Sequence, residues 1–497
     1  MVADSDQLKA IPTQSPVSGS RTLLTGGRLA LLALAGTSIL CGLALPMVPD
    51  KFQLPLVALV PAVIVGLYIL KSPFFGVYMF YLYEYLRPYD FIPALRPLRL
   101  AMLIEIVTLA SWALYMLRKR VPLKWVPFNW ASLGFLAVIG LSVIFAANNF
   151  YAYKVFKLMA ITLVMYLIAT NVVNSIKRLE SLLWMLLLVH IYFSIHGIYN
   201  FAIIGYTSAG QNTSGVVGSS FIGDENDFAL ALNTMIPFAY FMATWVKKMW
   251  KKLVSASALF LLVLGVASSF SRGGWVGLVA VIIFCILNSR RKLSALAYTG
   301  LLATALLAFA PSSYWTEMET ISDTSESTAN ARLEYWETAI RMYADHPVFG
   351  VGAGNGGVWM PAYFTGAGDA NRQWGRAFHG TIPQMLAETG TVGAVCYFAM
   401  LILAIGYLLK VKRRYKRPDS NQLPVVLAKS LLGGIVGYMA CAIFLSTVYY
   451  PQLWTLYMLT VTLFLVCSSG NESGLTLDGL APEALRPTVA QAAKRTR

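Results

Sequence analysis

One histidine with arginines nearby is the strongest candidate for proton-transfer chemistry in this sequence. His379 follows Arg372 and Arg376 and comes just before a long apolar stretch, so we expect it at the boundary between water and a membrane. Imidazole titrates near neutral pH, and guanidinium groups can hold an anion close to it. We therefore predict that His379 is catalytic, with a structural role as the alternative, and that Arg372 and Arg376 bind an anionic substrate group.

The other three histidines fit structural roles better. His190 and His196 lie six residues apart in one apolar stretch, on different faces of the expected helix, which favours packing or interhelical hydrogen bonding. His346 directly precedes Pro347, at the expected C-terminal end of a helix, where a protonated imidazole is favoured.

Two further arginines are candidate anion ligands. Arg272 lies in a short connection, Ser271–Trp275, whose glycines allow close approach to a ligand; an interfacial anchor beside Trp275 is the alternative. Arg332 and Arg341 are nine residues apart on an expected helix and therefore point in opposite directions. Because Glu337 offers Arg341 an ion pair one turn earlier, we prefer Arg332 as the ligand.

An acidic segment, Asp224–Asp227, opens another apolar stretch. Its carboxylates and Asn226 favour the positive end of a helix, which predicts an N-terminal cap; a divalent cation site is the alternative. The five cysteines all lie in apolar segments without a CxxC pair, so we predict neither a disulfide framework nor a metal site, and no cofactor.

The composition places these residues in a membrane protein. Of the 497 residues, 57% are hydrophobic and 12% charged, and the mean hydropathy is +0.62. About 14 apolar runs are long enough to cross a bilayer. This excludes a soluble enzyme, a disulfide-stapled secreted domain and a disordered chain. The net charge of +16 gathers in short basic loops, which are typical of the cytoplasmic side, so we expect no nucleic-acid partner.

We predict an all-α fold: a polytopic transmembrane helical bundle of about 12–14 spans, with a large periplasmic loop that contains amphipathic helices. The apolar segment near 73–87 either spans the membrane or is re-entrant. One amphipathic helix is expected from Asn330 to about Asp345. The predicted organisation is a cytoplasmic tail (1–27), a bundle (28–311) with a periplasmic loop (206–226), a periplasmic catalytic loop (312–382), C-terminal spans (383–469) and a cytoplasmic tail (470–497).

Four motifs, in this order and spacing, resemble the bacterial O-antigen ligase and polymerase superfamily. They are Ser271–Gly277, then Arg332-x-x-x-Trp336-x-x-Ala339, then Pro347-x-x-Gly350-x-Gly352-x-Gly354, and finally His379 followed by Gln384-x-x-Ala387–Glu388-x-Gly390-x-x-Gly393. The segment Gly223–Leu230 is also similar to an entry to a spanning helix in that family.

The resemblance implies a metal-independent, inverting glycosyltransferase of the inner membrane, with cytoplasmic termini and a periplasmic active site. Such enzymes move a glycan from undecaprenyl diphosphate to a hydroxyl on a glycolipid such as lipid A core, a glycan or a protein. Ligation is our first choice; a repeat-unit polymerase or a protein O-glycosylation ligase is the alternative. A lipid-linked glycan flippase ranks lower, and a structural scaffold lower still.

By this resemblance His379 matches the essential loop histidine, and Arg272 and Arg332 match arginines near the lipid diphosphate. Gly380 departs from the pattern, in which Asn or Ser is commoner. Asn226 and Trp336 are candidates for supporting contacts. Glu388 lies nine residues beyond His379, so we expect it to act as a buried counter-charge to an arginine rather than in catalysis.

Overall fold

A computed structural model describes residues 49–204, 223–289, 327–366, 368–416 and 422–469, with residues 292, 293, 296 and 300. All regular structure in this part is helical, and nine of its helices are long and apolar enough to cross a membrane. The predicted all-α polytopic bundle is thereby confirmed. The terminal tails, the apolar segment near 28–48, most of the segment near 293–311, residues 312–326 of the predicted catalytic loop, and most of the 206–226 loop lie outside the described residues.

The amino-terminal half is a run of helices joined by short connections. They are α2 (Asp50–Lys71), α3 (Pro73–Leu86), α4 (Pro88–Phe91), η2 (Pro93–Leu98), α5 (Leu100–Lys119), α6 (Pro127–Phe145), α7 (Asn149–Val172) and α8 (Ile176–Ile204). The segment near 73–87, spanning or re-entrant by sequence, is α3. Its 14 residues are fewer than the about 20 that a straight crossing needs.

The core is built around α9 (Glu225–Trp245), which packs against α8, α10 (Met249–Ser268), α11 (Arg272–Asn288) and α17 (Leu423–Ala442). Small residues on α17 permit this packing. A Cβ added at Gly434 would lie 2.7 Å from the Thr234 carbonyl oxygen of α9. Close backbone approach of this kind is how helices associate in a bilayer. The last helix, α18 (Pro451–Ser468), packs against α16 (Thr381–Arg414) and α17.

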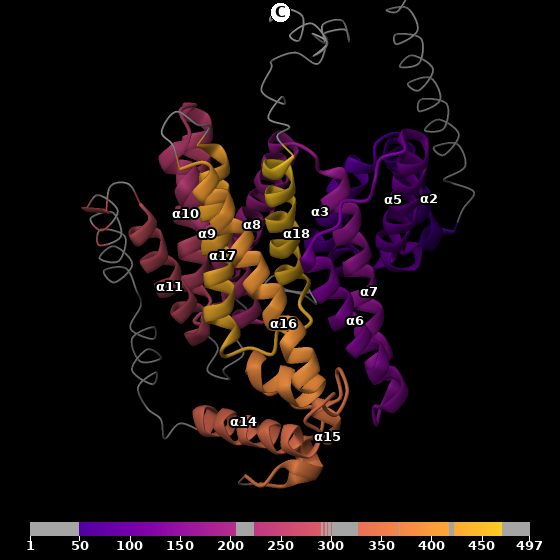
Figure 1. Cartoon of the computed structure of the whole chain (residues 1–497), viewed down its shortest axis with the longest axis vertical. Helices are drawn as coiled ribbons and strands as arrows, with labels where there is room; N and C mark the ends of the chain where they lie inside the picture. Colours follow the sequence, from indigo (N-terminus) through magenta and orange to yellow (C-terminus); the bar gives the residue numbers. More distant parts are fainter. Residues whose placement is uncertain are drawn as a thin grey trace, which may run out of the picture.

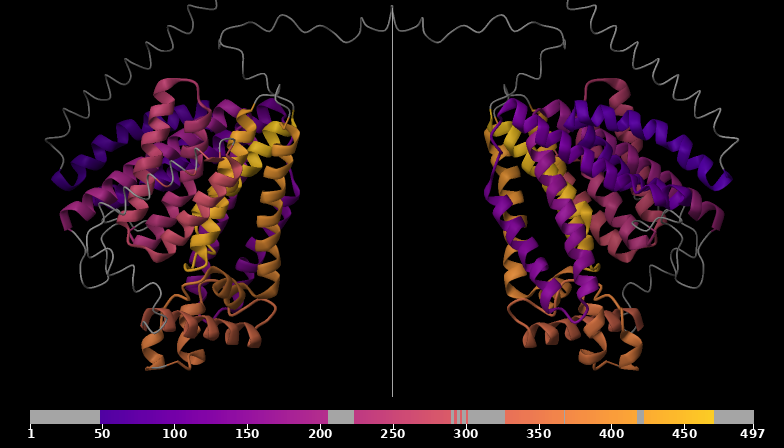
Figure 2. Two further views of the ribbon diagram at one scale, coloured as in Figure 1. Left: turned by 90° about the vertical axis from the view of Figure 1, so that its left-hand side faces the viewer. Right: turned by 90° about the vertical axis from the view of Figure 1, so that its right-hand side faces the viewer.

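A helical cap covers one end of the bundle. It consists of α14 (Ser327–Asp345), α15 (Gly356–Tyr363) and η4 (Ala370–Gln373), and α14 crosses the end of the bundle rather than running along it (Figures 1 and 2). The amphipathic helix expected from Asn330 therefore exists and begins three residues earlier. Its buried Ala339 and Met342 form a small core with Met360 and Phe378.

The cap is joined to the bundle at a break inside α16. Gly390 has φ 61° and ψ −163°, which interrupts the helix and frees backbone groups on both sides. The chain after α14 pairs with them: the Val351 N–H donates to the Ala387 carbonyl (2.8 Å), and the Thr391 N–H donates to the Pro347 carbonyl (2.8 Å). The backbone groups freed at the break thus hold the glycine-rich loop, which we define as residues 350–357, by hydrogen bonds.

Replacing Gly390 with alanine should destabilise this junction. A Cβ there would lie 2.4 Å from the Val348 carbonyl oxygen, and the left-handed backbone alone costs about 1–3 kcal/mol for a non-glycine residue. We expect a lower unfolding temperature in detergent and faster hydrogen exchange in residues 347–356. Gly406→Ala is the matched control on the same helix, because no atom lies within 4 Å of its Cβ position. Equal unfolding temperatures for the two variants would contradict this role of the break.

Candidate active site

The backbone of His379 is fixed from both sides just before α16 begins. Its N–H donates to the Ser446 hydroxyl (3.1 Å), and its carbonyl accepts a hydrogen bond from the Trp336 indole (3.3 Å). Its φ of 52° lies in the left-handed region, which a non-glycine residue occupies only when its surroundings impose it. The cap, through α14, and the connection between α17 and α18 therefore position this residue together.

The charges around His379 favour a neutral imidazole. Partial burial, which limits hydration of the ring, lowers its pKa below the usual 6.5, and the cations Arg332 and Arg376 lower it further. Asp224 acts in the opposite direction and raises the pKa. A neutral imidazole at neutral pH can accept a proton, and the nearby carboxylate can stabilise the imidazolium that results.

Asp224 caps the first turn of α9. Its Oδ1 accepts hydrogen bonds from the backbone N–H groups of Asn226 (2.8 Å) and Asp227 (3.3 Å), so the predicted helix cap is confirmed. Within the described ranges, no group of three or more His, Cys, Asp or Glu side chains is placed to hold a metal ion.

Asn226 links the start of α9 to the start of α11. The Ser271 hydroxyl donates to Asn226 Oδ1 (2.6 Å) and accepts from the Gly274 N–H (2.9 Å), so it caps α11. Asn233, seven residues and so about two helical turns further along α9, donates to the Gly274 carbonyl (2.9 Å). Arg272, the first residue of α11, is therefore held beside the entry to α9.

Arg332, on α14 of the cap, is near both the start of α9 and His379. It interacts electrostatically with Glu225 at the start of α9 and with His379. Arg341, on the same helix, donates to Glu337 and Thr365 instead, as the nine-residue spacing predicts. The structure thus assembles a histidine, cationic side chains and helix-capping carboxylates from α9, α11, α14 and the segment before α16.

Arg376 and Arg372 differ in their surroundings. Arg376 is exposed and close enough to His379 to lower its pKa. The Arg372 side chain is 87% exposed, and its closest acidic partner is Asp369 at 3.8 Å. The structure does not bring Arg372 into the His379 cluster, because η4 turns it toward solvent.

Glu388 does not have the predicted role of counter-charge to an arginine. It lies on α16 two residues before the break at Gly390, where its carboxylate accepts the backbone N–H groups of Gly354 and Gly356, both at 3.0 Å. Gln384 lies 3.4 Å from the same carboxylate. The glycine-rich loop turns its amide groups inward, and a buried carboxylate is the acceptor they find.

Replacing Glu388 with alanine should loosen the glycine-rich loop. Two buried N–H donors would lose their acceptor, at about 1–3 kcal/mol each. We expect a lower unfolding temperature and faster amide exchange at Gly354 and Gly356, with Glu388→Gln intermediate because it keeps one acceptor oxygen. Amide exchange at these glycines that is unchanged in Glu388→Ala would show that the carboxylate does not hold the loop.

Residues 257–398 match the family model described as O-antigen ligase. Over this segment the chain is similar to the O-antigen ligase family. The resemblance predicted from the four motifs is thereby confirmed, and the match supports an activity of the O-antigen ligase or polymerase type in a multi-pass membrane protein. None of the curated proteins searched matches the chain.

Several contacts around the candidate site could not be found from local sequence patterns. Asn355 is fully buried, accepts the Asn148 N–H (2.7 Å) and donates to the Asn148 carbonyl (3.2 Å), which ties the glycine-rich loop to the start of α7. The Tyr450 hydroxyl donates to the Asp227 carboxylate (3.1 Å). The only hint in the sequence is a polar residue inside each of these otherwise apolar or glycine-rich segments.

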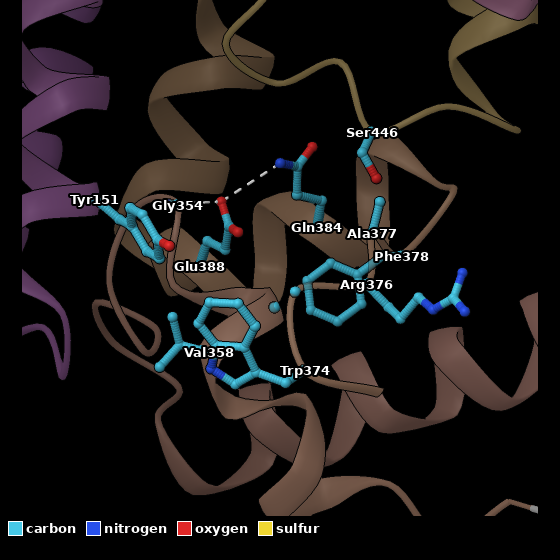
Figure 3. A pocket seen from close by; sticks show the side chains of 12 residues that line it. Tyr151, Gly354, Val358, Trp374, Arg376, Ala377, Phe378, Gln384, Glu388 and Ser446 are labelled. Carbon is cyan, nitrogen blue, oxygen red and sulfur yellow. Dashed lines mark hydrogen bonds between the residues drawn. The ribbon is translucent and has the colours of Figure 1, made fainter. Parts of the chain in front are cut away.

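The candidate site also contains a cavity of about 440 Å³ next to His379. The glycine-rich loop, the start of α7, the segment 374–378, the first turns of α16 and Ser446 line it (Figure 3). Glu388 and Gln384 face this cavity, whereas the Arg376 guanidinium points away from them (Figure 3).

Proposed function

We propose that this protein is an inverting glycosyltransferase that moves a glycan from undecaprenyl diphosphate to a hydroxyl acceptor. The observation that carries the proposal is the cluster in which His379, with a lowered pKa, lies among Arg332, Arg376 and Asp224. The match to the O-antigen ligase family supports the substrate class. The acceptor is a glycolipid such as lipid A core, and the site faces the periplasmic side of the inner membrane.

In the proposed reaction the acceptor oxygen attacks the anomeric carbon of the donor sugar as His379 takes the hydroxyl proton. The new carbon–oxygen bond forms while the bond to the diphosphate oxygen breaks, and the diphosphate leaves with the electron pair. Direct attack inverts the anomeric configuration. One positioned base contributes about 10²–10⁴-fold to such a step.

Guanidinium groups are suited to the charge that develops on the leaving group. Arg272 and Arg332 form bidentate hydrogen bonds to phosphate oxygens in this proposal, and Arg376 adds positive charge near the anomeric carbon. Asp224 stabilises the imidazolium of His379 after proton transfer. Asn226 and Trp336 are positioning residues, since they act through Ser271 and through the His379 backbone.

The rate of transfer should fall at acidic pH with a midpoint below 6.5. His379 must be neutral to accept a proton, and its pKa is lowered, so the base stays active until the pH drops through that lowered pKa. Arg332→Ala removes one cause of the lowering, so its residual activity should have an acidic limb displaced to higher pH. Plots of kcat/KM against pH measure both. A midpoint at or above 6.5 in the wild type would contradict a lowered pKa of the base.

The proposal is tested with the purified full chain in liposomes, an undecaprenyl diphosphate-linked glycan, and lipid A core, a free glycan or a peptide as acceptors. One glycan block attached to lipid A core supports a ligase, a ladder of lengthening glycans supports a polymerase, and a labelled peptide supports a protein ligase. Movement of the lipid across the bilayer without a new glycosidic bond would overturn the proposal in favour of a flippase. We also propose that the transfer needs no metal ion, and loss of transfer in EDTA would overturn this part of the proposal.

A further inference from the structure

The cavity beside His379 contains groups that the proposed reaction does not use. Its volume of about 440 Å³ falls within the range of about 300–1,000 Å³ for small-molecule sites. Gln384 and the carboxylate of Glu388 line it, together with the rings of Tyr151, Trp374 and Phe378 (Figure 3). Neither the diphosphate nor the proton transfer requires these side chains.

Aromatic rings form the apolar part of the cavity wall. Trp374 is 56% exposed, although a large indole is usually covered, and its ring centroid lies 6.5 Å from that of Tyr151. The face of an aromatic ring carries partial negative charge, so it attracts the positively polarised C–H groups of a ligand. An uncovered indole beside a polar cavity is therefore suited to a ligand with one C–H face.

The polar part of the wall can accept and donate further hydrogen bonds. Glu388 is 4% exposed, and each of its oxygens accepts one backbone N–H at 3.0 Å. Gln384 Nε2 also donates to this carboxylate (3.4 Å), so about one of its four acceptor positions remains for a hydroxyl donor. Gln384 and Ser446 add amide and hydroxyl groups. A ligand that combines a C–H face with hydroxyl groups around its edge is a pyranose sugar.

The cavity is continuous with the proposed reaction centre. Ala377 and Phe378 line it and directly precede His379, and Ser446, which also lines it, accepts the His379 N–H. We propose that the cavity is a subsite for an uncharged pyranose unit of a glycan substrate, stacked on Trp374 and hydrogen-bonded to Glu388 and Gln384. This inference rests on the proposed function, and it holds for a sugar of either the acceptor or the donor glycan.

Transfer kinetics test the subsite with Trp374→Ala, Trp374→Phe and a control, Phe150→Ala. Phe150 precedes Tyr151, is 60% exposed and does not line the cavity. Loss of one aromatic contact should raise a KM by about 2- to 12-fold in Trp374→Ala, with kcat little changed and partial recovery in Trp374→Phe. The substrate whose KM rises identifies the glycan bound. If neither KM rises above that of Phe150→Ala, the proposal is wrong.

A binding measurement makes the test independent of transfer. Saturation-transfer NMR on the purified full chain would use the methyl glycosides of glucose, galactose, mannose and N-acetylglucosamine as probes. We expect saturation of ring C–H protons of at least one probe in the wild type and Phe150→Ala, and its loss in Trp374→Ala. No binding of any probe, or equal binding by Trp374→Ala, would overturn the subsite. A wild type that binds sugar without transferring glycan would overturn only the proposed function.

Discussion

Replacing His379 with alanine should lower the rate of glycan transfer by about 10²- to 10⁴-fold, the usual contribution of a positioned general base. The backbone contacts of His379 with Ser446 and Trp336 do not involve its side chain, so the variant should fold and bind the donor. The loss should therefore appear in kcat rather than in the KM for the donor. Initial rates of glycosylated-acceptor formation measure it.

His346→Ala is the matched control, because His346 is an exposed histidine at the end of α14, where its ring lies near Trp359. It should transfer glycan at the wild-type rate. If His379→Ala keeps the wild-type rate while its unfolding temperature is unchanged, His379 is not the base.

Replacing Arg332 with alanine should cost about 10²–10³-fold in kcat, by analogy with removal of one donor to a developing negative charge. The guanidinium is close enough to Glu225 and to His379 to lower the pKa of each. Arg332→Lys should recover only part of the rate, because an ammonium lacks the planar fork that binds two phosphate oxygens. Single-turnover rates at saturating donor measure the effect.

Arg341→Ala provides the comparison on the same helix. Arg341 contacts Glu337, Thr365 and the Tyr363 carbonyl, all within the cap. Its removal should affect stability slightly and leave kcat unchanged. Equal losses in the two arginine variants would mean that α14 contributes through folding alone and that Arg332 has no direct role at the diphosphate.

The fold and part of the site follow from short-range patterns in the sequence. Apolar runs of bilayer length predict the spanning helices, and Leu333, Trp336 and Ile340 at helical spacing predict α14. The preference of carboxylates for helix N-termini predicts the Asp224 cap. These features depend on neighbours within a few turns, so one stretch of sequence is enough to predict them.

The remaining contacts join segments that are distant in the chain. Glu388 meets the amides of residues more than thirty positions earlier, because the break at Gly390 opens α16 there. Asn355 meets Asn148 across 207 residues. An isolated polar residue in the sequence carries no information about such a partner, and the exposure of Arg372 depends likewise on how η4 packs.

The proposed reaction is a single displacement, assisted by His379, at the anomeric carbon of a sugar linked to a lipid diphosphate. The most direct test is the anomeric configuration of the product bond, determined by NMR, with the released lipid quantified in the same reaction. We expect inversion, one undecaprenyl diphosphate for each acceptor glycosylated, and formation of both products about 10²- to 10⁴-fold slower with His379→Ala. Retention of configuration, or full transfer by His379→Ala, would contradict it.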